Sequence, residues 1–166
     1  MALIVEKYGG TSVGSIERIN AVAEKVSRTH AAGNQMVIVV SAMSGETNRL
    51  LEMAKEISPD MPAREADVLV STGEQVTIAL LCMALIKNGE KARSYTGGQV
   101  RIETDTSHGR ARIQNIDDSR IKKDLAKGKI IEVSEPPRPR VLIVREILPP
   151  WGVVVQILLP LLWLLH

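Results

Sequence analysis

The sequence contains little cysteine and little excess charge of either sign. Its 166 residues include one cysteine, Cys82, and their formal net charge is +2. A single cysteine excludes an internal disulfide framework and is typical of a reducing compartment, so we expect a cytoplasmic protein. Because positive and negative residues are interspersed, nothing indicates nucleic acid as a partner. No basic segment followed by an apolar one opens the chain, so we expect no secretory signal.

Metal-ligand spacing is also missing from the sequence. His108 and Arg110 lie near Asp105 in a predicted loop, but they do not have the spacing of a metal site, so we interpret them as solvated and predict no metal-binding residues. Cys82 lies in an apolar helical run, which favours a small buried hydrophobe over a catalytic thiol. His30 is predicted to be an exposed residue near the end of a helix.

Strands and amphipathic helices alternate from the first residues to about residue 130. The β-branched run 36–40 is typical of a strand that is buried on both faces of a parallel sheet. Further strands are predicted at 2–5, 92–95, 100–103 and from 129, and helices at about 15–32, 46–57, 63–70, 74–87 and 117–127. This alternation predicts a layered α/β domain with a largely parallel sheet.

The first predicted helix carries one apolar stripe and has a clear stop. Ile16, Ile19, Ala23 and Val26 recur at helical spacing, which indicates a face that packs on the core. Gly33 follows the helix, at the position where glycine commonly ends one. We expect the pair 88–89, Asn-Gly, to end a later helix in the same way.

A glycine-rich turn joins the first strand to this helix. The segment reads Lys7-Tyr8-Gly9-Gly10-Thr11-Ser12-Val13-Gly14-Ser15. Adjacent glycines let the backbone approach a ligand closely, and the helix N-terminus directs N–H groups towards an anion. Lys7 adds a mobile positive charge that suits phosphate. The segment therefore indicates a phosphate-handling site, with a plain strand-to-helix turn as the alternative. Its glycine spacing fits neither a Walker A loop nor a dinucleotide fingerprint.

A second polar segment, 41–48, follows the buried strand 36–40. Ligands of open α/β sheets bind outside the carboxyl ends of the strands, so Ser41, Ser44 and Thr47 are candidates for ligand contacts. The alternative for Ser44 is a helix cap, with Thr47 as a residue of the first turn. The residues favour the cap for Ser44 and the ligand for Ser41 and Thr47.

A third polar segment, 71–75, interrupts a helical stretch, and we predict a turn there. Glu74 stands beside apolar neighbours, where a carboxylate without a partner is costly. It either caps a helix or meets a cationic group of a ligand, and the sequence leaves both readings open.

These segments resemble the amino-acid kinase family, and within it the bacterial aspartate kinases. They occur in family order and at family-like spacing between residue 1 and about residue 130. The matching segments are Lys7–Val13, Val40–Gly45, Ser71–Glu74 and Lys129–Ile130. The resemblance implies a three-layer αβα sandwich with a mainly parallel sheet, here truncated.

The resemblance also implies an activity, namely transfer of the ATP γ-phosphoryl group to the β-carboxylate of L-aspartate. The product is 4-phospho-L-aspartate, in the entry step of lysine, threonine and methionine biosynthesis. ATP and Mg²⁺ are the implied cofactors, L-aspartate is the implied partner, and the full-length enzyme is expected to be a homo-oligomer.

The resemblance assigns roles to individual positions. Lys7 is the implied catalytic residue and also contacts the phosphates of ATP. Ser41 lines the active site, while Thr47 and Glu74 contact aspartate, with Glu74 near its ammonium group. The implied cofactor-binding residues are Lys7, Tyr8, Gly9 and Gly10.

The resemblance ends near residue 131, where the composition changes. Prolines alternate with arginines at 136–140, and 147–166 is almost wholly apolar. Family members continue instead with a strand, a glycine turn and the segment Thr-Thr-Leu-Gly-Arg-Gly-Gly-Ser-Asp-Thr-Thr. Residues 149–159, back-translated and read one nucleotide out of register, permit that segment in order, and 141–148 and 160–166 permit its neighbours. We therefore infer a frameshift in the coding sequence between about Ile131 and Val141.

Residues 1–130 are thus interpreted as the N-terminal part of a catalytic domain, and 131–166 as an aberrant tail that is out of frame. We expect no strand in 147–166, because prolines remove hydrogen-bond donors and the run does not alternate. The alternative is a non-catalytic, truncated kinase lobe that is tethered to a membrane by this tail, whose length would allow a span. A third reading is a family member that acts on glutamate, carbamate or a nucleotide, and the segment 71–74 argues against it.

Overall fold

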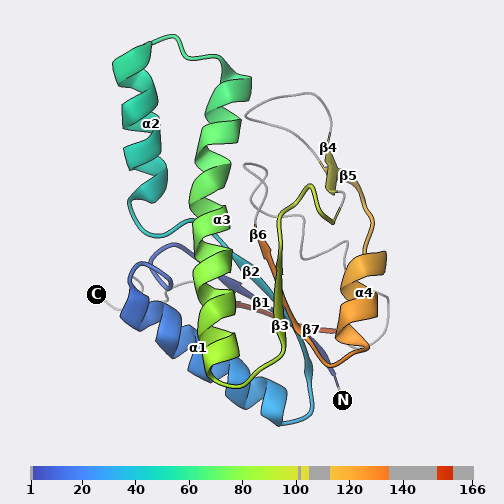
Figure 1. Cartoon of the computed structure of the whole chain (residues 1–166). Coiled ribbons are helices and arrows are strands. Elements are labelled where there is room, and N and C mark those ends of the chain that lie inside the picture. The colour runs from blue at the N-terminus through green and yellow to red at the C-terminus, as the bar shows by residue number, and fades with distance from the viewer. Residues whose placement is uncertain (1, 101, 105–112, 135–152, 159–166) are drawn as a thin grey trace, which may run out of the picture.

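The chain folds into three layers, with helices on both faces of one parallel sheet (Figure 1). The computed structural model describes residues 2–100, 102–104, 113–134 and 153–158. The strands lie in the order β3-β6-β2-β1-β7, and every neighbouring pair is parallel. Their bounds are β1 (Leu3–Tyr8), β2 (Gln35–Val40), β3 (Ala92–Tyr95), β6 (Ile130–Ser134) and β7 (Val153–Leu158). The predicted layered α/β fold with a mainly parallel sheet is confirmed.

The central strand β2 divides its side chains between two cores. Met36, Ile38 and Val40 are buried with residues of helices α1 and α3 on one face of the sheet. Val37 and Val39 are buried with residues of α4 on the other face. The helices are α1 (Ile16–Ala31), α2 (Glu46–Ile57), α3 (Ala63–Lys87) and α4 (Ser119–Leu125). Burial on both faces explains why β2 is a continuous apolar run.

Helix α1 follows the predicted pattern except at its first residue. The Ser15 hydroxyl accepts a hydrogen bond from the Arg18 N–H (3.3 Å) and caps the helix. Gly33 has a φ of +87°, a conformation that glycine adopts readily, and the helix ends just before it. Ile19, Ala23 and Val26 are buried as predicted, but Ile16 is 53% exposed. Ile16 begins the helix and precedes the part of α1 that packs on the sheet.

Helix α3 runs unbroken for 25 residues, so the predicted turn at 71–75 is wrong. The hydroxyls that suggested a turn bond to the helix itself: Ser71 to the Val68 carbonyl and Thr72 to the Leu69 carbonyl, both at 2.7 Å. Such local bonds are compatible with a helix when tertiary packing holds it. By length and hydropathy α3 could cross a membrane, but buried core helices share both properties, and α3 packs on α1, α2 and the sheet.

Two short strands form a separate antiparallel pair. β4 (Ile102–Thr104) overlaps the strand predicted at 100–103, whereas its partner β5 (Ile113–Ile116) was not predicted. Helix α4 is shorter than expected, beginning at Ser119 and ending at Leu125 rather than covering 117–127. The loop residues 105, 108 and 110 lie outside the described residues.

Strand β7 contradicts the expectation that 147–166 contains no strand. It pairs in parallel with β1 over six residues, from Leu3↔Val153 to Tyr8↔Leu158. Pro150 and Pro160 flank this segment instead of interrupting it, and strands of parallel sheets need no alternation. A membrane helix through 147–166 would exclude this strand, so the structure does not favour the tethered alternative. The other residues of 135–166 lie outside the described residues.

Candidate functional site

The three polar segments meet at the carboxyl edge of the sheet. The Ser41 N–H donates to the Tyr8 carbonyl (3.2 Å), so the chain after β2 runs beside the chain after β1. A Cβ placed on Gly10 would lie 2.6 Å from the Ala42 carbonyl oxygen. A Cβ on Gly73 would lie 3.1 Å from the Ala42 Cβ. Ala42 is therefore the point at which the glycine-rich turn, the segment after β2 and helix α3 come together.

The glycine-rich turn needs glycine at one position for space. Any side chain on Gly10 would collide with the backbone at Ala42, whereas Gly9 has room for a Cβ. The turn closes with a hydrogen bond from the Ser12 N–H to the Gly9 carbonyl (2.9 Å) and enters α1 at its cap. Its backbone therefore lies close to a helix N-terminus, as a phosphate-binding turn requires.

Adjacent residues of β1 face opposite sides of the sheet at this edge. Tyr8 is buried with α1 and α3, and its hydroxyl donates to Glu6 (2.6 Å). Burial raises the pKa of the Tyr8 hydroxyl, and the hydrogen bond to Glu6 raises it further. Because side chains alternate along a strand, half-buried Lys7 lies on the opposite face from Tyr8. A ligand at the turn would meet Lys7 through its ammonium group and Tyr8 through its backbone.

Helix α2 begins within the second segment, at Glu46, without the cap that was predicted. Its N-cap is Gly45, with a φ of +83° and no side-chain hydrogen bond, so the capping role of Ser44 is wrong. A residue with positive φ turns the chain sharply into the helix, which leaves Ser44 exposed. Ser41 is half-buried, and Thr47 is exposed in the first turn of α2. The ligand contacts that the sequence favoured for these two residues stay predictions.

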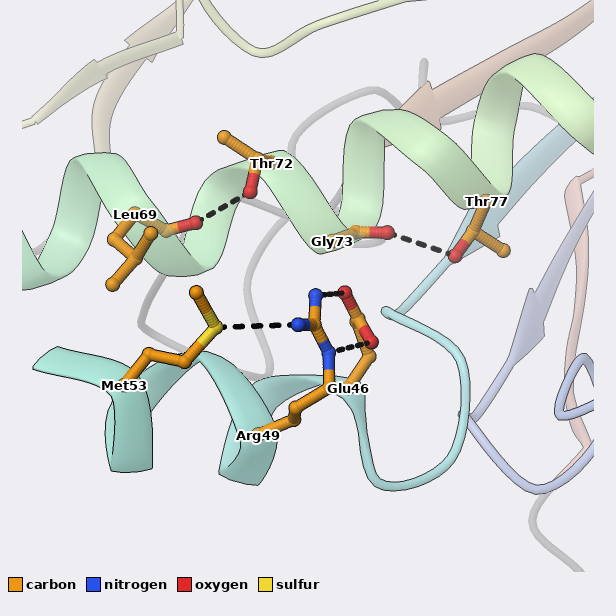
Figure 2. Close-up of polar contacts among 7 residues, drawn as sticks. All are labelled: Glu46, Arg49, Met53, Leu69, Thr72, Gly73 and Thr77. Carbon is orange, nitrogen blue, oxygen red and sulfur yellow. Dashed lines mark hydrogen bonds and ion pairs between the residues drawn. The ribbon is translucent and has the colours of Figure 1, made fainter.

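An ion pair on α2 lies against α3 beside the third segment (Figure 2). Arg49 donates from Nε to Oε2 of Glu46 (2.9 Å) and from Nη2 to Oε1 (2.7 Å), a two-pronged geometry. The guanidinium holds the pKa of Glu46 below its usual value. On α3, the Thr77 hydroxyl donates to the Gly73 carbonyl (3.1 Å). Glu74 is half-buried within α3, so the capping alternative for Glu74 is wrong.

Some residues of the site were not found from the sequence. Glu46 and Arg49 stand three residues apart on a predicted helix, a spacing that would have indicated an ion pair. Gly73 inside a helical pattern was a signal of close packing, but it was interpreted as a turn.

His30, predicted to be exposed, is half-buried instead, with Nδ1 2.8 Å from the Glu90 carboxylate. Among the described residues, no three His, Cys, Asp or Glu side chains form a group that could hold a metal ion.

Comparison with known proteins places this arrangement in a family. Residues 2–137 match the model of the amino acid kinase family. Over 134 residues, the chain is 63% identical to an aspartate kinase of Pseudomonas putida and 61% identical to an aspartokinase of Pseudomonas aeruginosa. These matches cover 81% of this chain and 33% and 32% of the two relatives. The chain thus spans about a third of the length of the curated relatives it matches.

Solved structures show the same fold. The aspartate kinase of Synechocystis matches with a TM-score of 0.66 and 46% identity, over 80% of this chain and 21% of that one. Aspartokinase III of Escherichia coli, in complex with lysine and aspartate, matches with a TM-score of 0.68 at 20% identity, over 80% of this chain and 40% of that one. The second likeness supports the fold alone. From the glycine-rich turn to β6, this chain belongs to the amino acid kinase family.

Proposed function

We propose that the chain is the N-terminal part of an aspartate kinase, which transfers the γ-phosphoryl group of ATP to the β-carboxylate of L-aspartate. The convergence of Gly10, Ala42 and Gly73 carries this proposal, because it joins a phosphate-binding turn to two segments with polar side chains. High identity to aspartate kinases over the same residues supports L-aspartate as the acceptor. A cytoplasmic location and a homo-oligomeric full-length enzyme are part of the proposal.

Different residues would contact the nucleotide and the acceptor. Lys7 and the turn at Gly9 and Gly10 would hold the phosphates of ATP, with Lys7 stabilising charge on the group in transfer. Tyr8 would contribute through its backbone. A carboxylate oxygen of aspartate then forms a bond to phosphorus as the bond to ADP breaks. The Mg²⁺ ion that the family resemblance implies would contact the nucleotide phosphates, as Mg²⁺ commonly does in phosphoryl transfer.

The acceptor side is formed by Ser41, Thr47 and Glu74. The half-buried carboxylate of Glu74 suits the ammonium group of an amino acid, and the hydroxyls of Ser41 and Thr47 suit its carboxylates. These groups fix the β-carboxylate for attack, and holding two reactants in place accounts for much of the rate of such a transfer. Aspartokinase III of Escherichia coli, which shares this fold, has been crystallised with aspartate and ADP.

The proposal includes a change of reading frame between about Ile131 and Val141. The family match ends at residue 137, and the residues beyond it are those whose out-of-register reading permits the family segment. The test compares two proteins, the chain as given and the chain whose gene is restored in frame to full length. We expect aspartate-dependent ATP turnover only from the restored protein, and aggregation of the other through its apolar tail. A soluble, monomeric and active chain as given would overturn the frame argument.

The acceptor assignment has its own test at Glu74. In the restored enzyme, Glu74→Gln keeps the shape and removes the charge, so we expect the KM for aspartate to rise about tenfold or more. The KM for ATP should hardly change, because the nucleotide is held elsewhere. Steady-state kinetics with each substrate varied in turn measures both. If neither KM moves while the melting temperature falls, Glu74 is a structural residue.

A further inference from the structure

Gly73 occupies a position where helix propensity disfavours it. It lies in the interior of the 25-residue helix α3, and its φ is not in the left-handed range. Glycine in a helix interior weakens the helix relative to alanine, so a conformational need does not account for it. The cause is instead the space around its Cα.

That space is occupied by residues of the neighbouring segment. A Cβ on Gly73 would lie 3.1 Å from the Ala42 Cβ, 3.1 Å from the Glu46 Cγ and 3.5 Å from the Leu50 Cδ1. Ala42 precedes α2, while Glu46 and Leu50 lie in its first two turns. The start of α2 therefore approaches α3 as closely as the absence of a side chain allows.

The Glu46 side chain cannot easily turn away from this contact. Its carboxylate receives two hydrogen bonds from Arg49, as Figure 2 shows, and its Cγ is thereby held against Gly73. A methyl group on Gly73 would displace Ala42 or the first turn of α2 by a few tenths of an ångström, because both contacts are tighter than ordinary van der Waals distance.

The contact is adjacent in sequence to the two residues assigned to aspartate. Thr47 follows Glu46 in α2, and Glu74 follows Gly73 in α3. We propose that Gly73 is a positioning residue, which sets the separation of Thr47 and Glu74 and thereby the dimensions of the L-aspartate site. This inference rests on the proposed function and goes beyond it, since Gly73 itself contacts no substrate.

The test uses the frame-restored, full-length enzyme and Gly73→Ala. We expect the KM for aspartate to rise roughly fivefold or more, because small displacements of substrate-holding groups are costly, while the KM for ATP stays within twofold. The melting temperature should change little, because the preference of alanine for the helix offsets the strain of the tight contact. Gly98→Ala is the matched control, since Gly98 has no atom within 4 Å of its added Cβ and should leave both KM values unchanged.

A second variant tests the contact itself. Ala42→Gly in the Gly73→Ala background removes the methyl group that the new side chain meets, and should return the KM for aspartate towards the original value. If Gly73→Ala does not fold, Ala42→Val presses on the same contact from the other side and carries the same expectation. Equal changes in both KM values, or no change in either, would overturn the inference. Absence of aspartate-dependent turnover in the unmutated enzyme would instead contradict the proposed function.

Discussion

Strands β1 and β6 lie on either side of β2, and each places a glutamate on the sheet face that α1 and α3 cover. The two carboxylates are almost wholly buried, with Glu6 1% and Glu132 0% exposed. Taking a carboxylate out of water is costly unless hydrogen bonds or a counter-charge replace the water. The two strands differ in whether that replacement exists.

On β1, both carboxylate oxygens of Glu6 have a partner that takes the place of water. Oε2 of Glu6 accepts a hydrogen bond from the Tyr8 hydroxyl (2.6 Å), and Oε1 lies 3.3 Å from Nζ of Lys25 on α1. The same ammonium group lies 5.5 Å from the centre of the Tyr8 ring, a cation–π distance. The buried carboxylate of Glu6 thus has one partner on its own strand and one on helix α1.

On β6, the carboxyl group of Glu132 lacks hydrogen-bond partners of this kind. Neither carboxylate oxygen of Glu132 has a hydrogen-bond partner among the described residues. Burial raises the pKa of Glu132 well above its usual value, and an interaction with the Cys82 thiol offsets this only in part. Burial likewise raises the pKa of Cys82 to about 11, and the charge of Glu132 adds to that shift.

The contrast shows which of the two buried glutamates lacks the polar partners that its surroundings require. Glu6 lies in β1 just before the glycine-rich turn, and both of its carboxylate oxygens have a partner. Glu132 falls within 131–141, where the proposed change of reading frame lies. The family match nevertheless extends to residue 137, so Glu132 belongs to the matched part of the chain, and its buried carboxyl group, without a hydrogen-bond partner among the described residues, is a local misfit of β6. The remaining predictions test each strand separately.

The largest effect is expected at the end of β1. Lys7→Ala in the restored enzyme removes the charge proposed to stabilise the transferred phosphoryl group, and such losses cost about 3 kcal/mol, or roughly a hundredfold in kcat. The melting temperature should change little, because Lys7 is only half-buried. Steady-state turnover and thermal melting of the same preparation measure both quantities. An unchanged kcat would remove Lys7 from the catalytic residues.

Local patterns predicted most of the fold but not its close contacts. The bounds of α2, the end of α1 at Gly33 and the buried run of β2 follow from caps, glycines and apolar periodicity, which are all local signals. The unbroken α3 does not, because Gly73 is explained by Ala42 and Glu46, which are distant in sequence. β7 was missed because the prolines of 147–166 and its lack of alternation argued against a strand, whereas a strand of a parallel sheet needs no alternation and Pro150 and Pro160 lie outside 153–158.

The candidate site divides in the same way. Lys7, Gly9 and Gly10 form a contiguous motif and could be singled out from their chemistry. The residues favoured a ligand contact for Thr47 and left Glu74 open between a cap and a ligand, and only the family resemblance assigned both to aspartate. Gly73 became informative only when α2 was seen against α3, because a close approach is a property of two segments.

Replacing each buried glutamate by leucine should change the free energy of unfolding by a smaller amount. The sign of this change should differ between the two strands. Glu132→Leu removes an unsatisfied carboxyl group and should stabilise the fold by about 1–2 kcal/mol. Glu6→Leu is the matched control, and it leaves the Tyr8 hydroxyl and Lys25 without their partner. It should destabilise the fold by about 1–3 kcal/mol. Denaturant unfolding of the frame-restored enzyme and of these two variants made in it gives both free energies, and equal signs would contradict the contrast between β1 and β6.

The pH dependence of stability sharpens this last comparison. The folded state raises the pKa of Glu132 above its usual 4.5, so it retains the proton that the unfolded state releases first. Below pH 4.5 the Glu132 carboxyl group is protonated in both states, and its contribution to stability is complete. As the pH rises from 4.5 through the folded pKa, that contribution is lost, because the unfolded state then binds fewer protons. The gain from Glu132→Leu should therefore grow between about pH 5 and pH 8, before Cys82 ionises. A gain that is constant over this range would mean that Glu132 is ionised in the fold, and that a counter-charge reaches it.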